Sequence, residues 1–416
     1  MGVAPTADPP VTWSETNNIR WKVKLPGAGT ATPIVWEDRV FIQTAVATGR
    51  KVEQPPGSPP SPPAADTTRR PPQRGGFGNW AKPVETFQFT LLCLDRRSGK
   101  TLWQRVAREE VPHEAHHPDH AFASYSPVTD GKCIVAFFGS RGLHCYDMQG
   151  NPKWQKDFGK MRTKMSFGEG ASPAVYGSTV VVNWDHEGDD FIAAFDVETG
   201  NELWRQPRQE DTSWSTPLIV RHDRQTQVVT AAMRRIRSYD LSSGKLIWEC
   251  GGLTANVIPS PVAGDGMVYA TSGFRGSALL AIRLGRSGDL TGTDAVAWTH
   301  GRNTPYVPSP LLYNGRLYFF ASNNGTLSCF DAKSGRPLID ARRLDDLDGV
   351  YASPVATSGR VYLVGRNGVT VVIMSSDSLD ILATNRLDDR IDASPAVAGG
   401  DLFLRGHEHL YCIAAK

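Results

Sequence analysis

A Ser-Pro or Thr-Pro dipeptide recurs along this chain, and its spacing constrains the fold more than any other feature. The eight copies that share one period begin at Thr32, Ser126, Ser172, Thr216, Ser260, Ser309, Ser353 and Ser394. Successive copies lie 41 to 49 residues apart, except for the first two, which are 94 residues apart. A fixed period of this size is typical of a repeat architecture in which each unit is one supersecondary element.

Each unit has the same internal order. An apolar run such as Val268-Tyr269 follows the proline, and a loop with glycine leads to a second apolar run. That run ends in an Asp-x-x-x-Gly segment followed by tryptophan, most clearly over 195–204. Proline suits the start of an inner edge strand because it has no N–H to donate to a ladder. Asp and Gly in this spacing predict a hairpin turn. Four short strands per unit predict an all-β protein, an eight-bladed β-propeller of four-stranded antiparallel blades.

The two ends of the chain predict how the ring closes. The last unit ends at Ile413 without a fourth strand, whereas residues 18–23 have the character of such a strand and contain Trp21. We therefore expect the N-terminal strand to complete the last blade, which leaves no open sheet edge and makes residues 1–416 one domain. The tryptophans expected to fill gaps between blades are Trp21, Trp103, Trp154, Trp204, Trp248 and Trp298.

An insertion over residues 49–84 accounts for the one long interval. Nine of the 29 prolines fall in it, together with a glycine-rich run at 74–78. Such a composition buries too little apolar surface to fold alone. We expect a disordered excursion between the second and third strands of the first blade; the alternative is a proline-rich ligand for a partner protein.

Composition and charge exclude several classes of protein. The formal charge is only +2, which removes the electrostatic case for a nucleic-acid binder. No run of 18 apolar residues is present, so we expect no membrane span. The first ten residues lack the features of a secretory signal, which fits either a cytoplasmic chain or one whose signal has been removed. The six cysteines show no zinc spacing and are expected to be buried structural thiols.

The repeat unit resembles the quinoprotein repeat of PQQ-like β-propellers. The resemblance covers about residues 18–416 apart from the insertion. That family includes PQQ-dependent alcohol dehydrogenases and the propeller lipoprotein of outer-membrane protein assembly. The stretches 182–188, 256–261, 304–310 and 404–407 are similar to PQQ-like propellers of planctomycete-type bacteria. The resemblance implies a periplasmic or secreted protein, and a closed ring needs no second copy for stability, so we expect a monomer.

The same resemblance speaks against quinone chemistry. Enzymes of the family carry adjacent cysteines over the quinone, a calcium site and often a haem domain. This chain has neither a Cys-Cys pair nor a Cys-x-x-Cys-His motif. We therefore expect no PQQ and assign no cofactor from the sequence alone.

Loops at one face of a propeller surround the mouth of its central channel, and several of them are rich in polar residues here. The candidates for ligand binding are Asp185, His186, Glu187, Trp214, Arg234, Arg235, Asn256, Arg275, Tyr306, Tyr351, Arg366, Asp392 and His407. Arginine, aromatic and carboxylate side chains together suit a polar small molecule, such as a sugar or an acid. The alternative is a solvated rim of ion pairs without a ligand.

Histidines concentrate on the same face. Four of the ten lie within residues 113–120, and two more, at 407 and 409, are in the last blade, which neighbours the first in a closed ring. Imidazoles of His117, His120 and His409, with Asp119 and Glu408 nearby in the sequence, could bind a divalent transition metal. They could equally act as an acid/base pair near neutral pH.

These observations favour a binding or scaffold propeller over an enzyme. The expected partner is a polar small molecule, a glycan or another protein, and in the last case the proline-rich insertion is the expected contact. The chain has no nucleophile elbow and no phosphate loop. The enzymatic alternatives are a degenerate quinoprotein oxidoreductase and a carbohydrate-active enzyme that uses the His/Asp/Arg rim.

Overall fold

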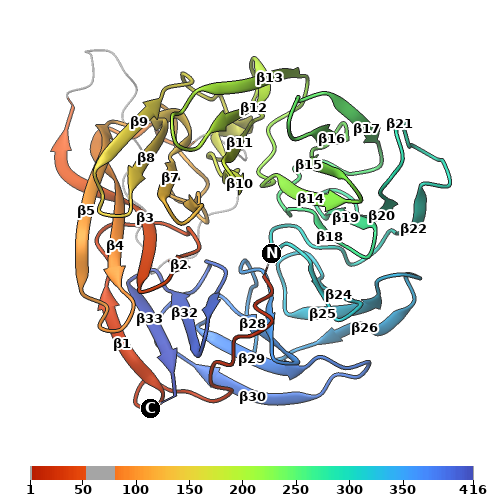
Figure 1. Ribbon diagram of the computed structural model, residues 1–416. Coiled ribbons are helices and arrows are strands. Elements are labelled where there is room, and N and C mark those ends of the chain that lie inside the picture. The colour runs from red at the N-terminus through yellow and green to blue at the C-terminus, as the bar shows by residue number, and fades with distance from the viewer. Residues whose placement is uncertain (1, 53–79, 416) are drawn as a thin grey trace.

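The computed structural model describes residues 2–52 and 80–415 and shows eight antiparallel sheets arranged as blades around one axis (Figure 1). Blades 1 to 3 consist of β2 (Ile34–Trp36), β3 (Arg39–Lys51), β4 (Glu85–Asp95) and β5 (Thr101–Glu110); β6 (Val128–Thr129), β7 (Cys133–Phe137), β8 (Leu143–Asp147) and β9 (Pro152–Lys156); and β10 (Ala174–Tyr176), β11 (Thr179–Trp184), β12 (Asp190–Asp196) and β13 (Glu202–Arg208). Short 3₁₀ helices cover Gly139–Arg141 and Lys164–Ser166.

The remaining blades repeat this order. Blades 4 and 5 contain β14 (Leu218–His222), β15 (Gln225–Ala231), β16 (Ile236–Asp240) and β17 (Leu246–Cys250), with β21 (Gly288–Asp289) added in parallel; and β18 (Val262–Gly264), β19 (Met267–Ser272), β20 (Ala278–Arg283) and β22 (Val296–His300). Blades 6 and 7 contain β23 (Leu311–Tyr313), β24 (Arg316–Phe320), β25 (Thr326–Asp331) and β26 (Pro337–Arg343); and β27 (Val355–Thr357), β28 (Arg360–Val364), β29 (Val369–Met374) and β30 (Ile381–Arg386).

Blade 8 closes the ring as predicted. It contains β31 (Ala396–Ala398), β32 (Asp401–Arg405) and β33 (His409–Ala414), and β1 (Ile19–Lys24) pairs with β33 as its outermost strand. Trp21 lies opposite Cys412 in this pairing. The eight-bladed all-β fold and its N-terminal closing strand are therefore confirmed.

The hydroxyl group of the Ser/Thr-Pro dipeptide links successive blades from blade 1 to blade 8. In blades 1 to 7 the backbone N–H of the Ser or Thr donates to the side-chain hydroxyl of the equivalent residue in the following blade. These bonds range from 2.9 Å, for Thr32 to Ser126, to 3.1 Å, for Ser172 to Thr216. The proline starts the inner strand, and the preceding residue satisfies its own N–H across the blade interface. The dipeptide is thus a contact between neighbouring blades.

A tryptophan from one blade packs on the turn glycine of the next. A Cβ built on Gly244 would lie 2.6 Å from the ring of Trp204, and the same contact joins Gly200 to Trp154. The indole N–H also donates to a carbonyl of that next turn, from Trp204 to Leu241 O at 2.8 Å. Equivalent N–H bonds are made by Trp21, Trp103, Trp154 and Trp298. Glycine is required at these turns because its φ is positive and because the ring leaves no room for a Cβ.

Three interfaces depart from this pattern, and one of them follows blade 6, whose strand β26 has Ile339 where the regular blades have tryptophan. Trp248 donates to Gln227 of its own blade at 3.1 Å, because blade 5 has no Asp-x-x-x-Gly turn to receive it. Blade 7 has no tryptophan in β30, and the N-terminal segment supplies Trp13 instead. Trp13 is 4% exposed and stacks on Tyr362 with ring centroids 6.3 Å apart. Residues 2–17 thus seal the junction of blades 7 and 8 before β1 begins (Figure 1).

Blade 1 carries the insertion. Its strand β3 continues through residues 49–51, so the strand extends three residues into the range predicted as the insertion. Strand β4 begins at Glu85, one residue beyond that range. The predicted excursion otherwise lies largely outside the described residues. No helix within residues 2–52 and 80–415 is long and apolar enough to cross a membrane.

All six cysteines are buried and free. Burial raises the pKa of the Cys93 thiol and of the Cys412 thiol to about 12. Both side chains pack with apolar neighbours in the core. These thiols are therefore structural, as the sequence predicted.

Candidate functional site

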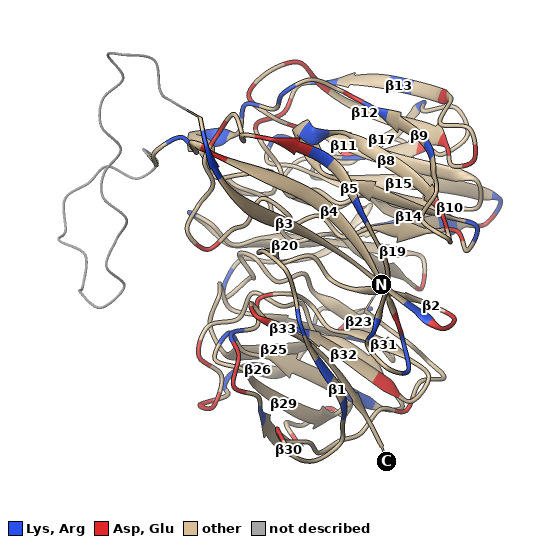
Figure 2. Cartoon of the chain, turned by 90° about the vertical axis from the view of Figure 1, so that its left-hand side faces the viewer, with Lys and Arg blue, Asp and Glu red and all other residues tan. Residues whose placement is uncertain are grey.

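The face that carries the loops between neighbouring blades and between the second and third strands of each blade is here called the top face. Figure 2 shows the ring from the side, with Lys, Arg, Asp and Glu mainly in loops and at strand ends. Residues 111–127, one of the two longest described connections between blades, join β5 of blade 1 to β6 of blade 2. Its Asp119 bonds to residues of blades 7 and 8, which are not neighbours of blade 2 in the ring. The loop therefore reaches across the mouth of the channel.

Asp119 joins three side chains from the far side of the mouth. Its Oδ1 accepts from Nη1 of Arg366 at 2.8 Å and from Nη2 of Arg390 at 3.1 Å. Its Oδ2 accepts from the hydroxyl of Tyr351 at 3.0 Å. The Arg366 guanidinium lies over the Tyr351 ring, 3.4 Å from its centroid. One carboxylate thus meets two guanidinium groups and a phenol.

The carboxylate of Asp392 accepts hydrogen bonds from the same two arginines. Arg366 donates to it through Nε at 2.6 Å and through Nη2 at 3.2 Å. Arg390 donates through Nε at 3.2 Å, and Nε2 of His407 lies 2.9 Å from Oδ2. The side chain of Asp392 is only 3% exposed, whereas those of Arg390 and His407 are 41% and 42% exposed. We call Asp119, Tyr351, Arg366, Arg390, Asp392 and His407 the mouth cluster.

The charges of the mouth cluster shift its pKa values. Burial raises the pKa of Asp392, but hydrogen bonds from His407 and Arg366 and the charges of both arginines outweigh it, so the pKa lies below the usual value. For Asp119 the guanidinium of Arg366 and the bonds from Tyr351 and Arg390 likewise outweigh burial, and its pKa is lowered. Burial raises the pKa of Tyr351. Both carboxylates are therefore ionised at neutral pH.

The structure brings four of the predicted ligand residues into this cluster, namely Tyr351, Arg366, Asp392 and His407. Asp185 lies elsewhere, in a buried ion pair with Nε of Arg208 at 2.6 Å, with both side chains fully buried. The next two residues in the sequence also bond to residues outside the mouth cluster. Nδ1 of His186 accepts from the backbone N–H of Arg162, and Glu187 accepts from the hydroxyl of Thr212.

The other predicted residues occupy blades 3 to 6. Arg234 and Arg235 pair with Asp211 and Asp289 at 3.1 and 3.2 Å. Trp214 is buried and donates to Gly168 O at 2.7 Å. Asn256 is buried with a positive φ of 54°. Tyr306 stacks on Phe274 at 5.0 Å, and Arg275 lies 5.5 Å from the same ring.

The three histidines proposed as metal ligands lie apart. His409 faces Asp389, with Nδ1 3.3 Å from Oδ2. His117 faces Asp119 at 3.9 Å. His120 is partly buried beside Ser124, and desolvation lowers its pKa to about 3. Over residues 2–52 and 80–415, no group of three or more His, Cys, Asp or Glu side chains is placed to hold a metal ion.

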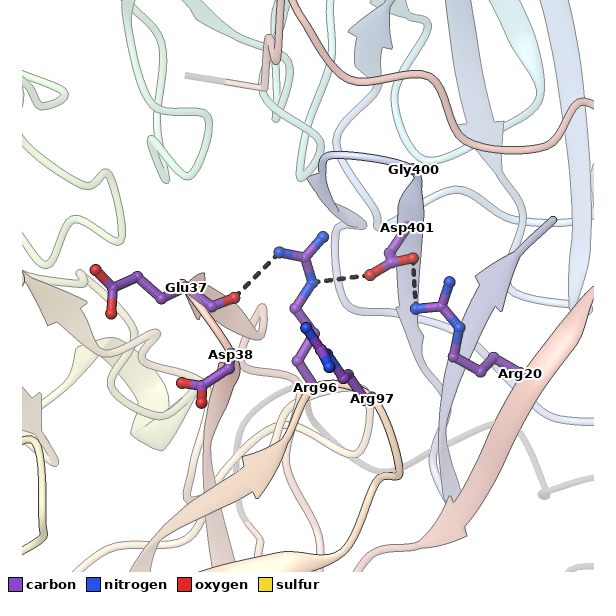
Figure 3. A pocket seen from close by; sticks show the side chains of 7 residues that line it. All are labelled: Arg20, Glu37, Asp38, Arg96, Arg97, Gly400 and Asp401. Carbon is purple, nitrogen blue, oxygen red and sulfur yellow. Dashed lines mark hydrogen bonds and ion pairs between the residues drawn. The ribbon is translucent and has the colours of Figure 1, made fainter. Parts of the chain in front are cut away.

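The opposite face has a pocket of about 560 Å³ at the seam between blades 8 and 1 (Figure 3). Asp401 lies between Arg20 and Arg96, 2.8 Å from each, and is buried. Arg96 also donates to Glu37 O at 3.1 Å and to Ala398 O at 2.5 Å. Because Arg96 bonds to both blades, these contacts fasten the ring closure.

Sequence reasoning missed Arg390 altogether and named Asp119 only as a neighbour of the histidines. Arg390 stands two residues before Asp392, so its position in a top-face loop was visible in the sequence. The contact of Asp119 was not, because nothing in the repeat indicates the path of a loop across the channel.

Comparisons with known proteins agree with this fold. The family model described as outer membrane protein assembly factor BamB matches residues 88–338 and 189–416. The protein of that name from Burkholderia pseudomallei (strain K96243) is 28% identical over 134 residues, 31% of each chain. The chain thus matches less than a third of the length of that relative.

Solved structures share the architecture at low identity. BamB from Moraxella catarrhalis aligns over 94% of this chain and 98% of its own, with a TM-score of 0.57 and 12% identity. Quinohemoprotein alcohol dehydrogenase from Comamonas testosteroni aligns over 97% and 78%, with a TM-score of 0.62 and 10% identity. These likenesses show the fold alone. With the family match covering most of its length, the chain belongs to the PQQ-like β-propeller family described as outer membrane protein assembly factor BamB.

Proposed function

We propose that this chain is a non-catalytic binding propeller that takes a polar ligand at the mouth cluster. The observation that carries the proposal is the convergence of six polar side chains from five loops at the mouth of the channel. Two of the cationic or titratable groups, Arg390 and His407, keep about two fifths of their side chains exposed. Exposed polar groups on a rigid scaffold are typical of ligand sites.

The cluster has a fixed part and an accessible part. Asp392 is buried and receives bonds from three side chains, so it sets the positions of both guanidinium groups. Arg390 and His407 present their outer atoms to solvent. Because the donors are held in place before a ligand arrives, little entropy is lost on binding.

The names of the relatives favour a protein partner and a periplasmic location. The relative from Burkholderia pseudomallei is named outer membrane protein assembly factor BamB. A scaffold that binds protein segments at the top face agrees with that name and with the absence of a nucleophile motif in the sequence. We therefore propose that the protein acts in the periplasm as an interaction module.

A thermal-shift screen tests the proposal. The library contains sugars, dicarboxylates, acidic and basic peptides, PQQ and divalent metals, and each hit is repeated with Arg366→Gln and with the control Arg286→Gln. Arg286 pairs with Asp294 at 3.1 Å and is not part of the mouth cluster. A ligand at a hundred times its Kd stabilises the protein by about 2.7 kcal/mol.

We expect hits whose stabilisation is lost in Arg366→Gln and retained in Arg286→Gln. Hits that stabilise Arg366→Gln as much as the wild type would show that the ligand site lies elsewhere. Chemical conversion of a hit by the wild-type protein would contradict the non-catalytic assignment.

A further inference from the structure

We infer that the mouth cluster recognises the carboxylate of an acidic peptide segment, and that Asp119 occupies this position in the free chain. The inference rests on the proposed function, because it names the ligand class of the same site. Its basis is the cross-channel contact itself: a loop between blades 1 and 2 places one aspartate against two arginines and a tyrosine of blades 7 and 8.

The contacts of Asp119 are those of a bound carboxylate. One oxygen receives two guanidinium N–H groups and the other receives a phenol O–H, all within 3.1 Å. Arginine is the preferred donor for carboxylates, and ionised partners make these bonds stronger than neutral ones. The occupant is itself a peptide side chain, carried by the loop segment His117-Pro118-Asp119-His120, so the site already accommodates an aspartate on a polypeptide.

The receptor persists without Asp119. Asp392 alone holds Arg366 through two bonds and Arg390 through one, and the Tyr351 ring supports Arg366 from its face. Without Asp119, two guanidinium charges face the single carboxylate of Asp392. One positive charge is then uncompensated at a site that is open to solvent, and a single incoming carboxylate restores the balance.

The tip of the loop is separable from its anchors. The N–H of His117 donates to Phe167 O at 3.1 Å, and the partly buried His120 is held by Ser124 at 2.7 Å. Asp119, between them, is 33% exposed. Its carboxylate accepts hydrogen bonds from Tyr351, Arg366 and Arg390, whereas its own loop offers it only Nδ1 of His117 at 3.9 Å among the described residues. A local shift of this tip therefore suffices to vacate the arginines, and the loop then acts as a competitor built into the chain.

Competition in cis lowers the apparent affinity by the fraction of time for which the site is vacant. Removing the Asp119 carboxylate must therefore tighten the binding of a carboxylate in trans. We expect about a tenfold lower Kd, which corresponds to about 1.4 kcal/mol of lost competition. A structural ion pair without a receptor role would give no such gain.

The test uses fluorescence anisotropy with the full chain and two labelled, end-capped peptides, Gly-His-Pro-Asp-His-Gly and its Asn counterpart. The variants are Asp119→Ala, the control Asp157→Ala and the double variant Asp119→Ala with Arg390→Gln. Asp157 is an exposed aspartate near Arg108 and lies outside the mouth cluster. If Asp119→Ala does not fold, Asp119→Asn takes its place, since it keeps the shape and loses the charge.

The aspartate peptide should bind Asp119→Ala about tenfold more tightly than it binds the wild type or Asp157→Ala. The Asn peptide should not bind, and the double variant should lose the gain. Equal affinity in wild type and Asp119→Ala, or equal binding of the Asn peptide, overturns the inference. Succinate as a competitor separates the sources: displacement at the same concentration as unlabelled aspartate peptide would overturn recognition of a peptide in favour of a free acid.

Failure of this inference can be told apart from failure of the proposed function. If Arg390→Gln abolishes binding of a ligand from the screen while Asp119→Ala changes nothing, the mouth site stands and Asp119 is not its competitor. If no substitution in the mouth cluster changes the binding of any ligand, the proposed function fails as well.

Discussion

Replacing Gly244 by alanine should test how the blades are locked together. Gly244 closes the turn of blade 4 with a φ of +70°, and a Cβ there would lie 2.6 Å from the ring of Trp204 of blade 3. Gly315 provides a matched control, because its φ is also +70° and nothing lies within 4 Å of its Cβ position. The two substitutions share the backbone cost and differ in the clash.

The magnitudes follow from these two terms. Placing alanine in a left-handed conformation costs about 1–2 kcal/mol in either variant. Overpacking against a buried ring adds about 1–3 kcal/mol, because Trp204 is only 8% exposed and its N–H is bound to Leu241 O at 2.8 Å. Gly244→Ala should therefore lose about 2–5 kcal/mol and Gly315→Ala about 1–2 kcal/mol.

Urea unfolding measures both free energies with the m-value as a check on comparable transitions. A second measurement in a Trp204→Leu background isolates the contact, since the cost of Gly244→Ala should there fall to that of Gly315→Ala. Equal losses for the two glycine variants in the wild-type background would refute the packing of tryptophan on turn glycine as the lock between blades.

Three further outcomes follow from the structure. Arg96→Ala should cost about 2–4 kcal/mol in urea unfolding, because the buried carboxylate of Asp401 loses one of its two partners; an unchanged midpoint would contradict the role of Arg96 in ring closure. Trp13→Ala should cost about 3–5 kcal/mol and raise hydrogen exchange at the contact with Tyr362; exchange equal to wild type would show that the N-terminal segment seals nothing. Burial raises the pKa of Asp190 to about 6, so the folded state binds this proton more tightly than the unfolded state and stability should fall as pH rises from about 4 to 6. Carbon-13 NMR of this carboxyl should show a midpoint near 6, and a midpoint below 4 would contradict its burial.

The repeat made the fold predictable because every blade is the same structural unit. Period, hairpin turns and proline positions sufficed for eight blades and for closure by residues 18–23, since strand order within a blade is local in sequence. The place of Trp204 between two blades was predictable for the same reason, because the position recurs in every regular blade.

Contacts without a repeat were not predictable. Trp13 takes the place of a missing blade tryptophan, yet the sequence around it shows no repeat pattern. The role of Ser and Thr in the dipeptide also emerged only from geometry, because their hydrogen bonds join residues 41 or more positions apart.

Some residues of the candidate site were likewise predictable from the sequence, and others were not. The sequence located four members of the mouth cluster, because loops of a propeller face are known once the strands are known. It also singled out Asp185, whose environment is a buried ion pair with Arg208. Polar loop residues at the mouth and polar residues buried beneath it have the same sequence signature, and only the three-dimensional path of each loop separates them.

Hydrogen exchange of residues 113–122 in the presence and absence of the aspartate peptide tests the account most directly. If the peptide carboxylate takes the place of Asp119 on Arg366 and Arg390, these residues should exchange faster in the complex while the Asn peptide leaves them unchanged. Unchanged or slower exchange with a saturating concentration of the aspartate peptide would contradict a ligand site at the mouth that Asp119 occupies in the free chain.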